Sequence, residues 1–293
     1  MNVGSLSIII LEKVKTNKMI DISIQKKLRE KYNPDGSPLR DYQLQLLRML
    51  KDFDEFCTVH DIRYWLSSGT CLGAVRHGGF IPWDDDVDVE MMREDYLKLI
   101  KLFKETDKYV IQTWKNDRYY SFSFAKLRDK SSIIYNSLYK YKGCFIDIFA
   151  LEKTNRKLSS FSAYLHNFFS GYLYDFLKSK SEKKTQLSKI IFGISSGLFM
   201  LIKYSYFAVI PFIRFVGYLL PNKKLRHQYG VGWVDNIRNE ENIFPIKRVL
   251  FEGFMLPVPG NYHKYLTNIY GNYSQIPSEV ELPKSHVQYL NSK

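Results

Sequence analysis

Cysteine is scarce in this chain of 293 residues. Its three cysteines, Cys57, Cys71 and Cys144, form no CxxC pair. An odd and sparse set of this kind excludes a disulfide framework and favours a reducing compartment. Cys57 and His60 lie three residues apart, but two further ligands are missing nearby, so we assign them to helix packing rather than to zinc. We predict a cytoplasmic protein.

Long uncharged hydrophobic runs are also missing. The apolar run at residues 6–11 has no basic region before it and no small-residue cleavage site after it, so we do not expect a signal peptide. A longer apolar segment, 190–220, is interrupted by Lys203 and Arg214, and its longest uncharged block has thirteen residues, 190–202. Because a spanning helix needs about 20 apolar residues, we predict that this segment lies on a membrane surface without crossing it, or is a buried helical subdomain.

Negative charge is under-represented. The chain has 43 lysines and arginines against 30 acidic residues, a formal net charge of +13, which predicts an anionic partner. Nucleic acid is not expected, because no RNA-recognition motif, helix-turn-helix pattern or zinc finger is present. An anionic membrane surface explains the charge better, since lysine clusters such as 178–189 adjoin the apolar segment.

The composition that remains is that of a folded protein, with 45% hydrophobic and 25% charged residues. Ser37 and Pro38 begin an amphipathic helix, and Ser67 to Thr70 begin another after a short strand at 63–66. A strand at 86–91 leads to a helix at 94–105 with Leu97, Ile100 and Phe103 facing inward. Further strands are expected at 109–114, 121–127, 132–135 and 144–149. Residues 158–229 look helical, and short irregular pieces surround a last helix at 262–270.

Four carboxylates occur within the five residues Asp84 to Asp88. Alternate residues of a strand share a face, so Asp86, Asp88 and Glu90 are expected side by side. Oxygen ligands of this kind bind hard divalent cations such as Mg²⁺. The simpler interpretation is a solvated acidic turn.

Two further features favour the metal. Asp147 stands in the middle of the apolar strand FIDIF, where a carboxylate is costly unless it is paired or bound to a cation. Gly69 and Thr70 open a helix after a strand and offer backbone N–H groups to phosphate. This arrangement of a turn, an Asp-x-Asp strand and a third aspartate is that of the nucleotidyltransferase fold.

Several cations and aromatic residues accompany the carboxylates. Lys126 and Arg128 alternate on one expected strand, so both are candidates for phosphate binding, as are Arg76 and His77. Arg76 is equally compatible with an ion pair to the acidic run, whereas for His77 a role as a turn residue is preferred over a catalytic one. We interpret Trp83 as a packing wedge rather than a base-stacking surface. A core or interface role is preferred over sugar contact for four tyrosines, Tyr262, Tyr265, Tyr270 and Tyr273.

Four segments carry a resemblance to a known family. They are the upstream stretch NPDGSPLRDYQLQLLRML, the run GTCLGAVRHGGFIPWDDDVDVEM, the segment CFIDIF and the stretch FEGFMLPVPGNYHKYLTNIYGNY. All four resemble the LicD family, which includes bacterial phosphocholine transferases and fukutin-related ribitol-phosphate transferases. The resemblance covers about residues 30–150 and 248–285. It implies an α+β fold with a nucleotidyltransferase-like mixed sheet flanked by helices. The domains expected are an N-terminal segment (1–36), a catalytic core (37–155), a helical, apolar and basic insertion (156–240) and a C-terminal part of the catalytic domain (241–293).

The resemblance also implies a reaction. A CDP-alcohol would donate a substituted, phosphocholine-like phosphate to a sugar hydroxyl of a cell-surface glycan or its lipid-linked precursor, with Mg²⁺ or Mn²⁺ as cofactor and CMP as product. Asp84, Asp86, Asp88 and Asp147 match the metal ligands, the last three also being catalytic. Gly69 and Thr70 match the phosphate-facing turn, and together with the candidate cations Arg76, Lys126 and Arg128 they would bind the donor. The alternatives are a nucleotidyltransferase that releases pyrophosphate and a basic membrane-surface scaffold with a vestigial acidic run.

Overall fold

The computed structural model describes residues 20–134, 138–168, 172–181, 185–234 and 237–278. The helices among them are α2 (Ile22–Tyr32), α3 (Pro38–Val59), α4 (Ser68–His77), α5 (Arg93–Leu102), α6 (Arg156–His166), α7 (Tyr172–Ser181), α8 (Gln186–Leu219), α9 (Glu240–Ile243) and α10 (Tyr262–Tyr270). The strands are β1 (Trp65–Leu66), β2 (Asp88–Met92), β3 (Tyr109–Gln112), β4 (Ala125–Asp129), β5 (Phe145–Thr154), β6 (Lys224–His227), β7 (Lys247–Phe251) and β8 (Phe254–Val258). The segment tested for a signal peptide, residues 1–15, lies outside the described residues.

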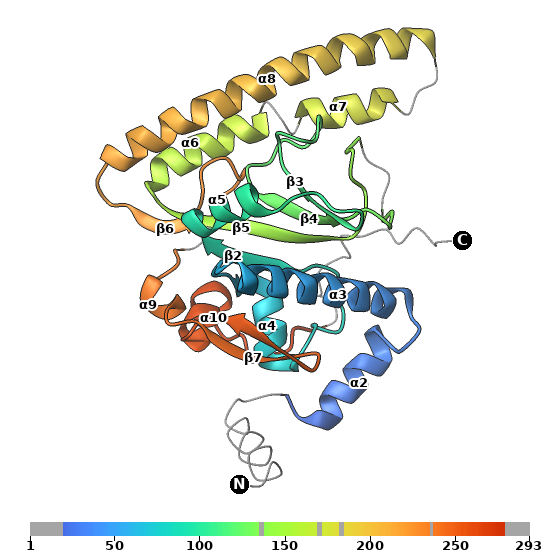
Figure 1. Ribbon diagram of the computed structural model, residues 1–293, viewed down its shortest axis with the longest axis vertical. Helices are drawn as coiled ribbons and strands as arrows, with labels where there is room; N and C mark the ends of the chain where they lie inside the picture. The colour runs from blue at the N-terminus through green and yellow to red at the C-terminus, as the bar shows by residue number, and fades with distance from the viewer. Residues whose placement is uncertain (1–19, 135–137, 169–171, 182–184, 235–236, 279–293) are drawn as a thin grey trace.

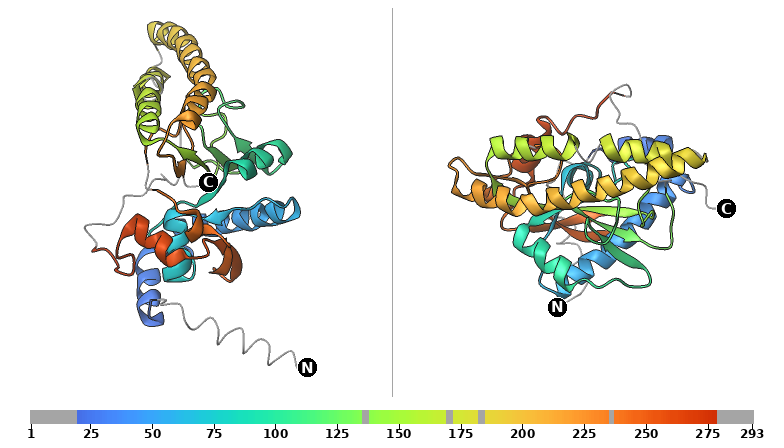
Figure 2. Two further views of the ribbon diagram at one scale, coloured as in Figure 1. Left: turned by 90° about the vertical axis from the view of Figure 1, so that its left-hand side faces the viewer. Right: turned by 90° about the horizontal axis from the view of Figure 1, so that it is seen from above.

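A mixed sheet forms the centre of the molecule. Its strand order is β1-β2-β5-β4-β3, and β6 pairs with the far end of β5. The pair β2–β5 is parallel and the other pairs are antiparallel. Helices α6, α7 and α8 lie on one side of this sheet, and α3, α4, α10 and the β7–β8 hairpin lie on the other (Figures 1 and 2). The predicted α+β class is confirmed.

Helix α3 follows directly from the sequence. The Ser37 hydroxyl accepts a hydrogen bond from the Arg40 N–H (3.2 Å), and Pro38 occupies the first turn. The apolar positions that recur at steps of three and four face the core: Leu46, Met49 and Phe53 are at most 1% exposed. The cap and the periodicity therefore fix where this helix begins and which face it buries.

Several sequence predictions were wrong in detail. Leu97 does not face inward but is 49% exposed, because α5 turns only part of its apolar surface to the sheet. Residues 132–134 form no strand. The C-terminal part is less irregular than expected, since β7 and β8 form a hairpin around Glu252 and Gly253. The expected insertion also contains β6, which joins the central sheet.

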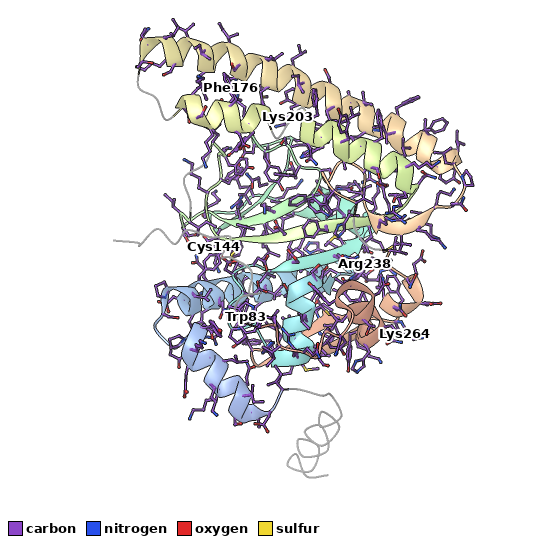
Figure 3. All side chains as sticks on the ribbon, turned by 180° about the vertical axis from the view of Figure 1, so that it is seen from behind. Trp83, Cys144, Phe176, Lys203, Arg238 and Lys264 are labelled. Carbon is purple, nitrogen blue, oxygen red and sulfur yellow. The ribbon has the colours of Figure 1, made fainter. Side chains whose placement is uncertain are left out.

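Helix α8 covers the apolar segment that the sequence singled out. By length and composition it is the one helix among the described residues that is long and apolar enough to cross a membrane. Of its three charged residues, Lys189 is exposed in the first turn, and the other two are engaged by the protein. Lys203 is 1% exposed and donates hydrogen bonds to the carbonyls of Asp117 (2.7 Å) and Arg118 (2.9 Å), whereas Arg214 donates to Glu152 (2.7 Å). Figure 3 shows Lys203 directed from α8 toward the body of the molecule.

His166, the last residue of α6, should make the stability of the fold sensitive to acid. It is 2% exposed, and burial lowers its pKa to about 4. Between pH 6.5 and 4 the unfolded state therefore binds a proton that the folded state does not, so stability is lost as the pH falls. We expect this to cost about 1.4 kcal/mol per pH unit in that window. Urea unfolding at pH 7 and pH 5 measures the loss of folding stability on acidification. This loss should be smaller in His166→Phe than in the unmodified chain. An equal loss in both proteins would contradict the assignment.

Candidate active site

The start of α4 and the start of β2 are joined at the candidate site. The Thr70 hydroxyl accepts a hydrogen bond from the Asp88 N–H (2.9 Å), and the Ser67 N–H donates to the Asp88 carbonyl (3.0 Å). Ser68 has a φ of 46°, in the left-handed region that non-glycine residues rarely adopt. Strain of this kind is concentrated at functional sites. The sequence predicted the helix start but not this backbone conformation.

The pairing of β2 with β5 brings the predicted aspartates together. Asp88 and Asp147 are direct neighbours in the parallel register. Asp84 lies against the first turn of α4, where a Cβ added to Gly69 would come within 3.0 Å of the Asp84 Oδ2 atom. Asp86 follows in the same loop and forms a hydrogen bond with Asp84. The strand β2 begins only at Asp88, so Asp86 belongs to the loop and not to the strand that the alternation predicted.

The clustered negative charge perturbs these carboxyl groups. Burial raises the pKa of Asp84 well above its usual range, and the charges of Asp86 and Asp85 raise it further. The pKa of Asp88 is also raised well above its usual range, first by burial and then by Asp86 and Asp147. Carboxylates that repel one another in this way are stabilised by a bound cation.

Lys126 and Arg128, the two predicted donor-binding cations on β4, have different surroundings. Lys126 forms an ion pair with Asp147 across the antiparallel register and lies 3.7 Å from the centroid of the Phe145 ring. Arg128 is fully buried and donates to Gln112 (2.7 Å) and to the Gly143 carbonyl (2.8 Å). The structure thus brings Lys126 to the carboxylates and leaves Arg128 inside the protein.

A pocket of about 460 Å³ opens beside these carboxylates. Ser68 and Gly69 line it from the start of α4, three aspartates line it from the acidic run, and the segment after α10 closes it. Its lining residues are Ser68, Gly69, Leu72, Arg76, Ile81, Trp83, Asp84, Asp86, Asp88, Tyr270, Asn272, Tyr273, Gln275 and Pro277. The fourth acidic residue of the run, Asp85, is 2% exposed and is not among them.

Gln43 of α3 holds the acidic loop in place. This fully buried side chain donates hydrogen bonds to the carbonyls of Asp84 (2.8 Å) and Ile81 (3.3 Å). Arg40 of the same helix forms a bidentate pair with Glu252 (2.7 and 3.2 Å), and Glu252 also accepts from the Phe80 N–H (3.3 Å). The FEGF turn of the β7–β8 hairpin therefore braces the loop that leads to the aspartates. Sequence reasoning missed both supports, because their partners are distant in the chain.

Arg76 lines the pocket but is directed at the protein backbone. Its Nη1 atom donates to the carbonyls of Tyr273 and Gln275 (both 2.9 Å), and its Nε atom donates to His77 Nε2 (2.9 Å). Burial lowers the pKa of His77 to about 3, so this ring is neutral at pH 7 and acts as an acceptor. Neither predicted alternative for Arg76, a phosphate contact or an ion pair to the acidic run, describes these contacts fully. The guanidinium clamps the segment that closes the pocket.

Removing this clamp should affect substrate binding more than chemistry. In Arg76→Met the carbonyls of Tyr273 and Gln275 lose a charged donor, and hydrogen bonds to charged groups contribute about 1.5–3 kcal/mol each. We expect the KM for a substrate bound in this pocket to rise about tenfold or more, with a smaller change in kcat. Steady-state kinetics measures both. A fall in kcat at unchanged KM would instead indicate direct contact with the reacting group.

The aromatic residues divide into two groups. Trp83, labelled in Figure 3, packs in T-shaped arrangements on Tyr32 and His77, with ring centroids 5.3 and 6.0 Å away. It also lines the pocket, so the predicted wedge forms part of the wall. Tyr265 is buried, whereas Tyr270 and Tyr273 line the pocket. The packing assignment of Cys57 and His60 is confirmed. Cys57 lies in the core and His60 stacks on Phe56.

The side chains of the site suit a hard divalent cation, because every predicted metal ligand supplies a carboxylate oxygen. Within the described residues, however, no three His, Cys, Asp or Glu side chains form a group that could hold a metal ion. Asp147 is instead held by Lys126. Magnesium commonly takes only one or two protein carboxylates and completes its shell with water and substrate phosphates. Asp86 and Asp88, with Asp84 adjacent, satisfy that smaller requirement.

Comparison with known proteins agrees with this geometry. Residues 61–193 match the family model LicD/FKTN/FKRP, nucleotidyltransferase domain. The chain is 29% identical over 262 residues to lipopolysaccharide cholinephosphotransferase LicD of Haemophilus influenzae, covering 85% of this chain and 96% of that protein. A 34-residue stretch, 12% of this chain and 7% of the relative, is 59% identical to human ribitol 5-phosphate transferase FKRP. The chain thus resembles the LicD family, whose model matches residues 61–193, and it is similar to LicD of Haemophilus influenzae over most of its length.

Proposed function

We propose that this enzyme transfers a substituted phosphate, such as phosphocholine, from a CDP-alcohol to a sugar hydroxyl of a cell-surface glycan or its lipid-linked precursor. The observation that carries the proposal is the set of three aspartates, Asp84, Asp86 and Asp88, that lines a pocket next to Asp147. The match to this family model supports transfer of a substituted phosphate to a glycan, because relatives are named cholinephosphotransferase and ribitol 5-phosphate transferase.

In the proposed reaction the acceptor hydroxyl oxygen attacks the distal phosphorus of the donor. The bond from this phosphorus to the oxygen of CMP breaks, and CMP leaves with that electron pair. Asp147, kept beside Lys126, takes the proton of the hydroxyl. The N–H groups at the start of α4 face the phosphates, where the positive end of the helix dipole stabilises negative charge. Phosphoryl transfer depends mainly on positioning and charge neutralisation, which these groups supply.

Mg²⁺ or Mn²⁺ is the proposed cofactor, held by Asp86 and Asp88 with Asp84 and Asp147 as the adjacent carboxylates. When bound, the ion neutralises charge that develops on the transferring phosphate. The chain's part is to keep several carboxylates together in spite of their repulsion, through Gln43 and the Thr70 hydroxyl. Lys126 balances the charge of Asp147.

The proposed reaction takes place in the cytoplasm. Three free, buried cysteines support a reducing compartment, because none of them forms a disulfide. Burial raises the pKa of Cys144 to about 11, so this thiol stays protonated and unreactive at neutral pH.

The test is incubation of the purified chain with CDP-choline, CDP-ethanolamine or CDP-ribitol, Mg²⁺ and an envelope extract. We expect CMP to form with one donor and only in the presence of extract. Pyrophosphate formed from CTP or ATP, with no CMP from any CDP-alcohol, would favour the nucleotidyltransferase alternative. The name of the matched family model, a nucleotidyltransferase domain, keeps that alternative relevant.

A further inference from the structure

We propose that the outer face of α8 docks on an anionic lipid bilayer, with the helix axis in the membrane plane. This inference goes beyond the proposed reaction and does not depend on it. It rests on the burial of individual side chains along α8, on the position of its charges and on the charge of the surrounding helices.

The outer face of α8 is a continuous apolar surface. Six large hydrophobic side chains on this face are between 50% and 72% exposed: Ile194, Leu198, Leu201, Phe212, Phe215 and Leu219. They recur at helical spacing, so they share one side of a helix about 50 Å long. Monomeric soluble proteins rarely expose a contiguous apolar patch of more than a few hundred Å². Figure 2 shows α8 running along the outside of the molecule with only α6 and α7 beside it in this layer.

No charged side chain interrupts this face. The two charged residues between positions 190 and 219 are Lys203, which is 1% exposed, and Arg214, which pairs with Glu152 on the inner side. A solvated surface helix would carry its charges outward. From residue 190 to the end of α8 both charged side chains are engaged by the protein, and the large exposed side chains of the outer face are apolar.

The inner face of α8 argues against a membrane span. Four side chains of this face pack against the rest of the protein and are at most 5% exposed: Phe199, Tyr206, Ile210 and Ile213. Lys203 donates hydrogen bonds to two carbonyls of the loop after β3. Insertion across a bilayer would break all these contacts. A helix that is anchored on one side and apolar on the other lies in the interface, about 5–10 Å deep.

Charge complementarity identifies the occupant as an anionic bilayer rather than a second copy of the chain. Residues 156–224 contain eleven lysines and arginines against two acidic residues, so this segment supplies +9 of the net +13. Lys157, Lys178, Lys189 and Lys224 are exposed on or beside α6, α7 and α8. Two copies would repel one another through this surface, whereas anionic headgroups are attracted to it.

Flotation of the full chain with lipid vesicles tests the proposal. We expect binding at low salt to phosphatidylcholine vesicles that contain phosphatidylglycerol, and weaker binding to phosphatidylcholine alone. In the triple variant Ile194→Glu, Leu201→Glu and Phe212→Glu, the partition coefficient should fall about 100-fold or more. The matched control places the same three charges at exposed apolar positions elsewhere, as Val59→Glu, Ile133→Glu and Met255→Glu, and should bind like the unmodified chain.

Four results would overturn the proposal. The first is that the unmodified chain does not float at low salt, and the second is that the triple variant floats as well as the unmodified chain. The third is that the control variant loses as much flotation as the triple variant. The fourth is that the bound chain resists alkaline extraction, which would indicate a membrane span. If the unmodified chain formed a dimer in solution and did not bind vesicles, and the triple variant were monomeric, the face would be assigned to a second copy of the chain. Thermal unfolding of each variant establishes that it is folded. CMP release from CDP-choline is measured separately in detergent, so failure of the docking and failure of the chemistry are distinguishable.

Discussion

Asp88→Asn should abolish transfer while the fold stays intact. Asp88 lines the pocket, neighbours Asp147 in the sheet and is the carboxylate on which the charges of Asp86 and Asp147 converge. The substitution preserves shape and the Asp88 N–H bond to Thr70, but it removes the charge that would hold a cation. Because charge stabilisation by a metal contributes several kcal/mol to phosphoryl transfer, we expect kcat to fall by about 10³-fold or more.

Two measurements accompany this variant. Thermal unfolding with and without Mn²⁺ should show a stabilising shift in the unmodified chain that is lost in Asp88→Asn. The matched control is Asp107→Asn, which removes a charge from an exposed position and should change neither activity nor the shift. Near-normal turnover of Asp88→Asn would refute the assignment of this carboxylate.

Glu90→Gln should be the most destabilising of the charge-neutralising changes considered. Glu90 is fully buried and accepts hydrogen bonds from side chains of four separate segments. They are Trp65 (3.1 Å), His227 (3.0 Å), Arg238 (2.7 Å) and Tyr265 (2.9 Å). Arg238, labelled in Figure 3, is only 5% exposed. Neutralising Glu90 leaves this guanidinium buried without its counter-charge, which costs about 3–5 kcal/mol.

Urea unfolding at pH 7 measures this loss. The same substitution in the exposed pair of Lys26 and Glu30, Glu30→Gln, is the control, because exposed ion pairs contribute about 0–1 kcal/mol. If Glu90→Gln lost no more stability than Glu30→Gln, the buried network would not be what joins β1, β2, β6 and α10.

Local features of the fold were predictable from the sequence. The Ser37 cap, the proline after it and the apolar spacing fixed α3, and the turn at Ser67 to Thr70 placed the start of α4. The bounds of β2 were less accurate, because the alternation begins at Asp86, two residues before the pairing with β5 begins at Asp88. Hydrophobic patterns with a period of 2 or 3.6 residues indicate which face of a strand or helix is buried. They carry this information only within a single helix or strand.

The supports of the candidate site could not be read from the sequence. Arg76 reaches carbonyls almost 200 residues later in the chain, and Arg40 is separated from Glu252 by 212 positions. Glu90 was expected on one strand face with Asp86 and Asp88, but the sequence did not indicate that it is buried. Its partners come from β1, β6, α10 and the segment before α9. Such contacts depend on topology, and local spacing does not encode them. The proximity of Asp88 to Asp147 was anticipated from the pattern of carboxylates and from the family resemblance.

The most direct test of the account is the identity of the nucleotide product. The purified chain is supplied with a CDP-alcohol carrying a labelled alcohol phosphate, a divalent cation and a glycan acceptor, and products are followed for the unmodified chain and for Asp88→Asn. The account predicts CMP in equal amount to label transferred to the acceptor, and neither product from the variant. Pyrophosphate from a nucleoside triphosphate, with the CDP-alcohol unchanged, would contradict it.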